Sequence, residues 1–306
     1  MLAFSGSGAS FSFAQLIVPS VGMSYSSYAQ AVAIDGLGST VVVEGSAGGV
    51  PADWIFTKMG ASWFPAGSFS PSQSGSVGID SGAVVIGGGE AAYTYSISGE
   101  MLQTLTAPDF VAGGTTGAFG APSVISGDTL LVTGEPEDSS FNLGHFGYVF
   151  VRSGSGWAQQ GKLIPSDLAA NSGPHFQFSV ALDENTAVLA STSGAYVFAR
   201  IGTAWSEVQK INVPDNAPAF GSSVALSGDV LVIGGNTYVG VPSAAYVYGR
   251  SRGSWILAAK LSSGAPDENS DGFGTSVATN VGTVAVSAPF ASPGGAVYLF
   301  ACQPNH

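Results

Sequence analysis

The sequence predicts an all-β fold, a six-bladed β-propeller built from four-stranded antiparallel blades. The first observation behind this prediction is the phrase "FGSSVALSGDVLVIGG" (220–235), which recurs in six related copies along the 306 residues. The second is that several copies are followed by a second recurring phrase, for example "AYVFARIGTAWSEVQKINVPD" (195–215). The third is that no window shows a sustained helical period of apolar residues. Together they indicate one strand-rich unit repeated along the chain.

The period of the repeat is typical of a propeller. One valine occupies the matching place in each copy, and successive valines lie 44 to 56 residues apart. Units of this length stack side by side, because each one buries its apolar faces against its neighbours. The matching valines are Val32, Val77, Val124, Val180, Val224 and Val277.

Each complete repeat contains four short apolar runs, which we interpret as the strands of one blade. The runs are rich in Val, Ile, Tyr and Phe and are bounded by Gly, Ser, Asp or Pro, which is the composition of strands and their turns. Four strands joined by polar loops make a propeller blade. The predicted blades span 28–70, 74–107, 119–166, 176–214, 220–263 and 273–300.

A tryptophan begins the fourth strand of most repeats. We expect these large side chains to be wedged between adjacent blades, where the gap between sheets widens. The alternative is a stacking platform for sugars. The residues are Trp63, Trp157, Trp205 and Trp255.

The last repeat stops after its third strand, "AVYLF" (296–300). Near the N-terminus, "GSGASFSFAQLIVPS" (6–20) aligns with the fourth-strand segment "GSGWAQQGKLIPS" (154–166). We therefore expect residues 1–20 to supply the outer strand of the last blade, three strands plus one, so that no strand edge stays unpaired. The unbroken repeat predicts a single domain over 1–306.

Composition excludes several classes of protein. Hydrophobic residues make up 45% of the chain and charged residues 9%, so a folded core is expected rather than disorder. The formal net charge of −12 disfavours nucleic acid and anionic lipid surfaces as partners. No apolar run is long enough for a membrane span, and the first residues, "MLAFSGSGAS", do not read as a signal peptide. The one cysteine, Cys302, cannot form an internal disulfide.

Three Phe-Gly pairs carry a resemblance to a known family. They are Phe119-Gly120, Phe220-Gly221 and Phe273-Gly274, with "GEP" (134–136) and "SAP" (287–289) following further along two of the repeats. The sequence resembles the FG-GAP repeat, the blade of the integrin α-subunit propeller and of many exported bacterial and fungal proteins. The resemblance implies a propeller that binds ligands or mediates adhesion outside the cell or at its surface. Integrin propellers have seven blades, so the six predicted here depart from that pattern.

Family members often bind calcium in a loop of the form D-x-D-x-D-G-x-x-D, because Ca²⁺ takes six to eight oxygen ligands. No loop of this sequence matches that form. The nearest are "APDENSDGFG" (265–274) and "GEPEDSSFNLG" (134–144), and a solvated acidic turn is the alternative for each. The candidate calcium ligands are Asp267, Asn269 and Asp271 in the first loop and Glu135, Glu137 and Asp138 in the second.

Blade topology predicts that one face of the propeller is acidic. Connections between blades share a face with the loops between second and third strands, and those loops contain 11 of the 20 acids and no Lys or Arg. Such a face can attract cations or a basic partner, although acids also simply favour solvated turns. The acids are Glu44, Glu90, Asp109, Glu135, Glu137, Asp138, Asp167, Asp215, Asp267, Glu268 and Asp271.

We predict a non-enzymatic module that binds a glycan or a protein through this acidic face. The alternative is an enzyme, a hydrolase or lyase, with its site at the mouth of the channel. No catalytic set of residues is recognisable, because the histidines and serines lack the partners and the strand–turn–helix context that catalysis needs. The candidate ligand-binding residues are Phe141, His145, His175, Tyr238, Glu137 and Asp271.

Overall fold

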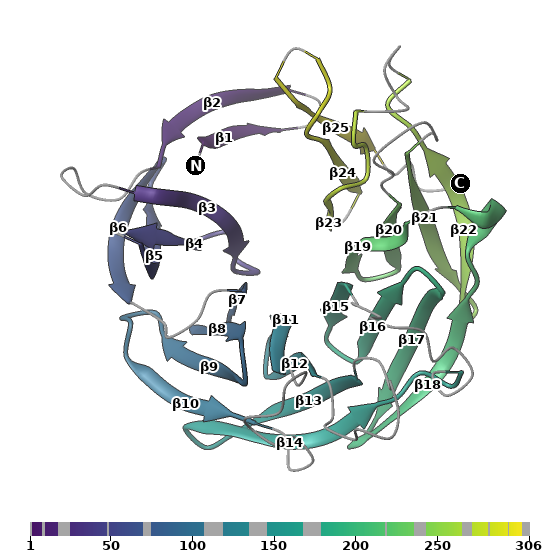
Figure 1. The fold of residues 1–306 in the computed structure, drawn as a ribbon, viewed down its shortest axis with the longest axis horizontal. Helices are drawn as coiled ribbons and strands as arrows, with labels where there is room; N and C mark the ends of the chain where they lie inside the picture. Colours follow the sequence, from purple (N-terminus) through teal and green to yellow (C-terminus); the bar gives the residue numbers. More distant parts are fainter. Residues whose placement is uncertain are drawn as a thin grey trace. The chain divides into compact units, whose positions relative to one another are not determined.

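A computed structural model gives the structure of the chain (Figure 1). The chain divides into two units: unit 1 contains 1–140 and 146–162, and unit 2 contains 141–145 and 163–306. The residues that the structure describes are 2–7, 10–17, 25–47, 49–69, 75–106, 119–134, 146–167, 179–217, 219–235, 243–264, 271–280, 282–292 and 294–301.

Unit 1 holds a two-stranded sheet and three four-stranded blades. Strand β1 (Leu2–Ser7) pairs antiparallel with β2 (Ser10–Leu16). The strands of the first blade are β3 (Tyr25–Ile34), β4 (Thr40–Ala47), β5 (Val50–Met59) and β6 (Ser62–Phe69). Those of the second are β7 (Ser76–Asp80), β8 (Ala83–Gly88), β9 (Ala91–Ser96) and β10 (Met101–Leu105). Those of the third are β11 (Phe119–Ser126), β12 (Thr129–Gly134), β13 (Phe146–Ser153) and β14 (Gly156–Leu163).

Unit 2 holds the other three blades. Those of the fourth are β15 (Ser179–Asp183), β16 (Thr186–Ser191), β17 (Gly194–Ile201) and β18 (Ala204–Ile211). Those of the fifth are β19 (Phe220–Ser227), β20 (Val230–Gly235), β21 (Ala244–Ser251) and β22 (Ser254–Leu261). The last sheet has three strands, β23 (Val277–Asn280), β24 (Thr283–Ala288) and β25 (Ala296–Ala301).

The predicted fold class is confirmed: the protein is an all-β, six-bladed propeller whose blades are antiparallel sheets in chain order. Among the described residues the only helical element is a 3₁₀ turn, η1 (Pro214–Asn216). None of the described segments forms a helix long and apolar enough to cross a membrane.

The second strand of each blade is the most deeply buried. Every residue of β8, β12 and β16 is buried, although these strands have short runs such as "AVVIGG" and "TAVLAS". A strand covered on both faces reads as a continuous run of apolar and small residues rather than an alternating one. The outer strands β18 and β22 instead expose residues such as Val208 and Ile256.

The Phe-Gly pairs have a structural reason. Phe220 is fully buried, and Gly221 has a φ of +84°, a conformation that favours glycine. A Cβ at Gly221 would lie 2.4 Å from the carbonyl oxygen of Ser191 in the preceding blade. Only glycine therefore lets the two backbones approach this closely. Gly120 and Gly274 repeat this geometry.

Each of these phenylalanines packs on an aromatic side chain from the third strand of its own blade. Phe119 lies 5.3 Å from Tyr148 between ring centroids, and Phe220 lies 5.6 Å from Tyr246. Tilted and edge-on contacts at such distances are favourable for aromatic pairs. The repeated "Phe-Gly" and "AYV" phrases thus encode the two halves of one contact.

A glutamine links outer strands of neighbouring blades. The Gln209 side chain on β18 accepts a hydrogen bond from the Trp255 backbone N–H at 2.7 Å and donates one to its carbonyl oxygen at 2.8 Å. Gln103 makes the same two bonds to Trp157, which lies on the next outer strand of unit 1. Trp157 and Trp255 are buried, which supports their predicted packing role.

Replacing Gln209 by Ala should lower the free energy of unfolding by about 1–3 kcal/mol, because it leaves two backbone groups without partners. Thermal and denaturant unfolding measure the change. Gln159→Ala is the matched control, since this residue lies on an outer strand but is exposed. Equal melting of both variants would show that the glutamine link contributes nothing to stability.

The N-terminal hairpin is anchored in unit 1. Ile17 is buried in a cluster with Val41, Val43 and Trp54. The Gln15 side chain donates a hydrogen bond of 2.9 Å to the Trp63 carbonyl oxygen and accepts one of 2.7 Å from the Trp63 backbone N–H. Gln103 and Gln209 make the same two bonds to a tryptophan of the next blade. Each of those two glutamines lies on the fourth strand of the blade that precedes its tryptophan, so β2 occupies a fourth-strand position. The pairing of residues 1–20 with the last blade stays a prediction.

Candidate functional site

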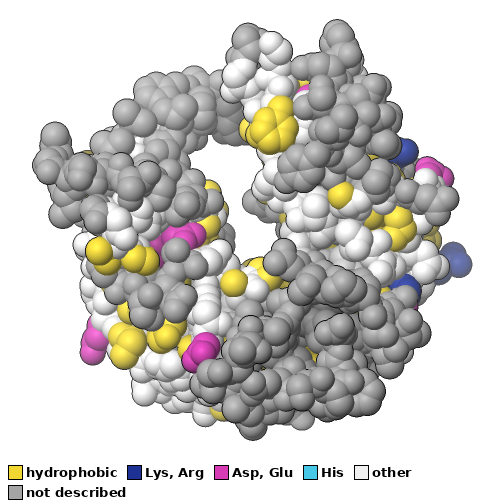
Figure 2. Space-filling view, viewed as in Figure 1, with side chains coloured by type: hydrophobic (Ala, Val, Ile, Leu, Met, Phe, Trp, Pro, Cys, Tyr) yellow, Lys and Arg dark blue, Asp and Glu magenta, His cyan; other side chains and the backbone are white. Residues whose placement is uncertain are grey.

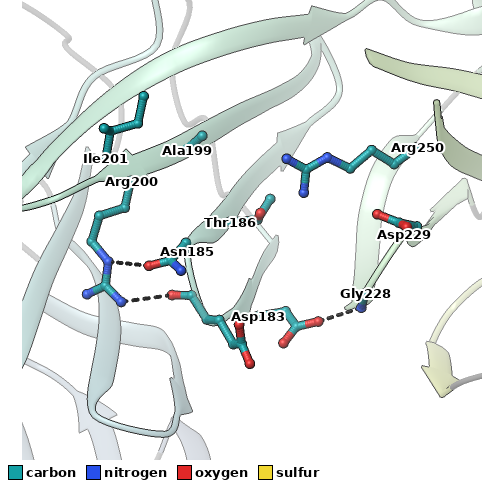
Figure 3. Close-up of a pocket in the computed structure, with 10 residues that line it drawn as sticks. Asp183, Asn185, Thr186, Ala199, Arg200, Ile201, Gly228, Asp229 and Arg250 are labelled. Atoms are coloured by element: carbon teal, nitrogen blue, oxygen red, sulfur yellow. Dashed lines mark hydrogen bonds between the residues drawn. The ribbon is translucent and has the colours of Figure 1, made fainter. Parts of the chain in front are cut away.

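A pocket of about 530 Å³ lies in unit 2, between the turns of the fourth and fifth blades (Figure 3). Two turns between first and second strands form part of it, one at 183–186 and one at 228–229. The ends of the third strands β17 and β21 contribute the rest, with Arg200 and Arg250. Turns of this kind share one face of a blade, so the pocket opens on exposed loops.

Asp183 fixes one side of the pocket. One of its carboxylate oxygens accepts a hydrogen bond from the Gly228 backbone N–H, which ties the first turn of the fourth blade to that of the fifth (Figure 3). Asp80 does the same in unit 1, where it accepts a bond of 2.6 Å from the Gly127 N–H. The turns that line the pocket are therefore held by a device that recurs in the propeller.

The arginines at the ends of the third strands follow a second repeated pattern. Arg152 donates to the Asp128 carboxylate at 3.1 Å, and its guanidinium lies 4.7 Å from the centre of the Trp157 ring. Arg200 donates to the Asn185 side chain at 2.7 Å and lies 5.3 Å from Trp205. In both blades the guanidinium is fixed between an aromatic face and a polar side chain of the first turn.

Arg250 departs from this pattern. Asp229 stands where Asp128 and Asn185 stand in their blades, yet within the described residues the Arg250 guanidinium makes no hydrogen bond or ion pair. It lies 5.9 Å from the Trp255 ring, the longest of the three distances. Figure 3 shows it directed towards Thr186 rather than Asp229. A cationic and an anionic side chain thus face the pocket without neutralising each other.

The other wall of the pocket is apolar. Ala199 and Ile201 lie on β17, and Ile201 is 80% exposed. The pocket therefore combines an apolar surface with donors from Arg250 and Asn185 and acceptors from Asp183 and Asp229. Such a combination suits a polar ligand that also has an apolar face.

Of the predicted ligand-binding residues, only Asp271 lies in the described part of the chain. It does not line the pocket; it is fully buried, and one of its oxygens accepts a hydrogen bond of 2.9 Å from the Phe273 N–H. Its other oxygen has no hydrogen-bond partner among the described residues. The remaining predicted ligand-binding and calcium-binding residues lie outside the described residues, namely Phe141, His145, His175, Tyr238, Asp267, Asn269, Glu135, Glu137 and Asp138.

The charge segregation predicted from the sequence is weaker in the structure. Lys210, on the outer strand β18, forms an ion pair with Asp167, and Lys260, on β22, approaches Asp215 at 3.7 Å. Lysines of two outer strands therefore pair with two of the predicted face acids. Figure 2 shows charged side chains as separate spots among the described residues of the face in view.

Glu44 is also not a solvated face acid. It is 4% exposed and lies directly opposite Asp53, which is fully buried, on the paired strands β4 and β5. Asp53 has no hydrogen-bond partner for either carboxylate oxygen. Burial raises the pKa of Asp53 from 3.8 to about 8, and the negative charge of Glu44 is the second cause of this shift. These two acids are closed off from solvent and so from any substrate.

Metal binding was predicted for two acidic loops. Within the described residues, no three His, Cys, Asp or Glu side chains gather closely enough to hold a metal ion. Both predicted loops fall almost wholly outside those residues, so calcium binding there stays a prediction.

The pocket was not predicted from the sequence, although a signal for it exists. An arginine precedes the turn into each tryptophan strand in "VRSGSGW" (151–157), "ARIGTAW" (199–205) and "GRSRGSW" (249–255). An Asp or Asn also recurs in the first turn, in "SGD" (126–128), "DEN" (183–185) and "SGD" (227–229). Because both kinds of turn lie on the same face of a blade, the two patterns together would have predicted that the arginines and the turn residues lie on one face.

A family model described as FG-GAP repeat matches residues 205–248. This segment covers most of β18, all of β19 and β20 and much of β21, including the Phe220-Gly221 contact. The chain is a β-propeller that contains an FG-GAP repeat. No curated protein has a significantly similar sequence.

Solved structures similar to this FG-GAP propeller come from several kinds of protein. A functionally unknown protein from Desulfotomaculum acetoxidans DSM 771 is 14% identical, with a TM-score of 0.58 over 95% of this chain and 88% of that chain. A protein from Lactobacillus plantarum is 15% identical, with a TM-score of 0.58 over 96% and 87%. A prolyl endopeptidase structure is 10% identical, with a TM-score of 0.57 over 89% and 39%. At these identities the likeness shows the fold alone.

Proposed function

We propose that this propeller is a non-enzymatic, lectin-like binding module, which takes a saccharide in the pocket between the fourth and fifth blades. The observation that carries the proposal is the pair of exposed charged groups, Arg250 at the end of β21 and Asp229 in the first turn of the same blade, which do not pair with each other and lie beside an apolar wall. A sugar ring offers hydroxyl groups to the polar side chains and a C–H face to Ala199 and Ile201.

The wider setting is proposed from the family resemblance. FG-GAP propellers that mediate adhesion act outside the cell or at its surface, and we propose the same location and role here. Calcium in the loop that ends at Asp271 is also proposed, supported by the free oxygen of that buried carboxylate. The acidic face around Glu137 and Tyr238 stays a second candidate for a glycan or protein ligand.

Asp229→Ala should weaken saccharide binding at least about tenfold, since a hydrogen bond to a charged group contributes roughly 1.5–3 kcal/mol. A glycan array followed by calorimetric titration of the best ligand measures the loss. Asp128→Ala is the matched control, because Asp128 occupies the same turn position in the third blade and does not line the pocket.

Both variants should melt close to the wild type, since Asp128 and Asp229 are exposed. Binding that survives Asp229→Ala but is lost on replacing Tyr238 or Glu137 would move the site to the acidic face. An array on which no saccharide is bound would contradict the proposed function.

A further inference from the structure

Among the described residues, Arg250 is the one arginine of three equivalent positions whose guanidinium makes no hydrogen bond or ion pair. Arg152 and Arg200 are each held by a side chain of the first turn, at 3.1 and 2.7 Å. The partner that the pattern would give Arg250 is Asp229, and no ion pair joins them. The fifth blade therefore has an arginine and a turn acid at the two positions of the pattern but no contact between their side chains.

The polar groups of the pocket define what a ligand must offer. Within the described part of the chain, Asp183 uses one carboxylate oxygen for the Gly228 N–H and has no partner for the other, and neither carboxylate oxygen of Asp229 has a partner. These acceptors call for O–H donors. The side-chain oxygen of Asn185 already accepts from Arg200, so Asn185 presents its amide N–H groups to the pocket.

Arg250 sets the charge of the ligand. A guanidinium binds a carboxylate through two parallel hydrogen bonds, which makes this pair both strong and directional. A densely anionic ligand such as a sulfate or phosphate ester would meet the carboxylates of Asp183 and Asp229 on its other sides. A ligand with one carboxylate and several hydroxyl groups avoids that repulsion.

On the basis of the proposed saccharide function, we infer that the pocket is specific for uronic acids, with Arg250 binding the sugar carboxylate. Asp183 and Asp229 accept hydrogen bonds from the hydroxyl groups of the ring. Ala199 and Ile201 contact its C–H face. Arg250 is therefore the residue that separates acidic from neutral sugars.

The test uses oligosaccharides of galacturonate and glucuronate, each beside its methyl ester, titrated into the full chain by calorimetry. The ester keeps the ring and its hydroxyl groups, replaces the negative charge of the carboxylate and adds one methyl group. The wild type should bind one of the acids at least about tenfold more tightly than its ester. Arg250→Gln should lower the affinity for the acid to that of the ester.

Arg252→Gln is the control, because Arg252 is an exposed arginine two residues away that does not line the pocket. It should keep the preference for the acid. If Arg250→Gln melts at a lower temperature, Arg250→Lys keeps the charge without the two-bond geometry and should retain part of the preference.

Two outcomes overturn the inference and leave the saccharide function standing: equal binding of acid and ester by the wild type, or an unchanged preference in Arg250→Gln. Binding of neither acid nor ester, together with binding of neutral sugars on the array, also overturns the inference alone. Failure of every saccharide to bind overturns both.

Discussion

Deleting residues 1–20 should destabilise the protein severely. The deletion removes Ile17, which is 2% exposed among Val41, Val43 and Trp54, and leaves that apolar cluster open to water. Burial of a large aliphatic side chain contributes roughly 1.5–3 kcal/mol. The two Gln15 bonds to Trp63 add about 0.5–1.5 kcal/mol each. Their sum, about 2.5–6 kcal/mol, is a large part of the net stability of a typical domain, about 5–15 kcal/mol.

The sequence predicts a further effect of the same deletion, because residues 1–20 are expected to complete the last blade. In the structure β25 is the edge of a three-stranded sheet, and its Val297 and Leu299 are 66% and 46% exposed. The first five residues of β21, the third strand of a complete blade, are all buried. An exposed apolar edge strand promotes aggregation.

Melting and solubility of the chain from Val21 onward measure both effects. The double variant Gln15→Ala, Ile17→Ala is the control, since it removes the anchors and keeps the strand β2. We expect the deletion to aggregate and the double variant to stay soluble with a lowered melting temperature. A soluble deletion variant that melts like the full chain would refute both the anchoring and the predicted closure.

Replacing Asp53 by Asn should stabilise the protein at neutral and alkaline pH. Asp53 is fully buried opposite Glu44, near Tyr95, and burial with the Glu44 charge raises its pKa to about 8. The unfolded chain loses this proton near pH 3.8, so between these values the folded state binds more protons than the unfolded state. The stability of the wild type therefore falls as the pH rises from about 4 to about 8, and this contribution is constant above that.

The slope is at most about 1.4 kcal/mol per pH unit. Asparagine carries no charge, and its amide N–H can donate to Glu44. We expect the free energy of unfolding of Asp53→Asn to exceed that of the wild type by roughly 3 kcal/mol at pH 7.5, so that the variant unfolds at a higher denaturant concentration. The difference should vanish near pH 4. Denaturant unfolding across this pH range measures it.

Glu100→Gln is the control for Asp53→Asn, because Glu100 is an exposed carboxylate of the same unit. It should leave the pH dependence of stability unchanged. Asp53→Asn with a wild-type slope, or with lower stability at pH 7.5, would mean that the buried carboxyl is charged and compensated by its surroundings.

The amino-acid sequence by itself determined the blades. The matching valines and the strand composition predicted six sheets, their chain order and the short last one, because a repeated unit must bury its faces against copies of itself. The strand positions of Trp63, Trp157, Trp205 and Trp255 were also correct. Local patterns suffice here, since strand pairing within a blade joins neighbours in the chain.

Only the tertiary structure decided the environment of the charged side chains. Glu44 and Asp53 look like ordinary hairpin acids in the sequence, yet both are buried, and Asp53 interacts with Tyr95 of the second blade, some 40 positions away. Arg200 and Arg250 occupy the same place in the repeat. Only the structure shows that Arg200 donates a hydrogen bond to Asn185, whereas Arg250 makes no hydrogen bond or ion pair within the described residues. Burial and side-chain pairing depend on which blade lies alongside, and a repeat that fixes the backbone leaves these features to residues distant in the chain.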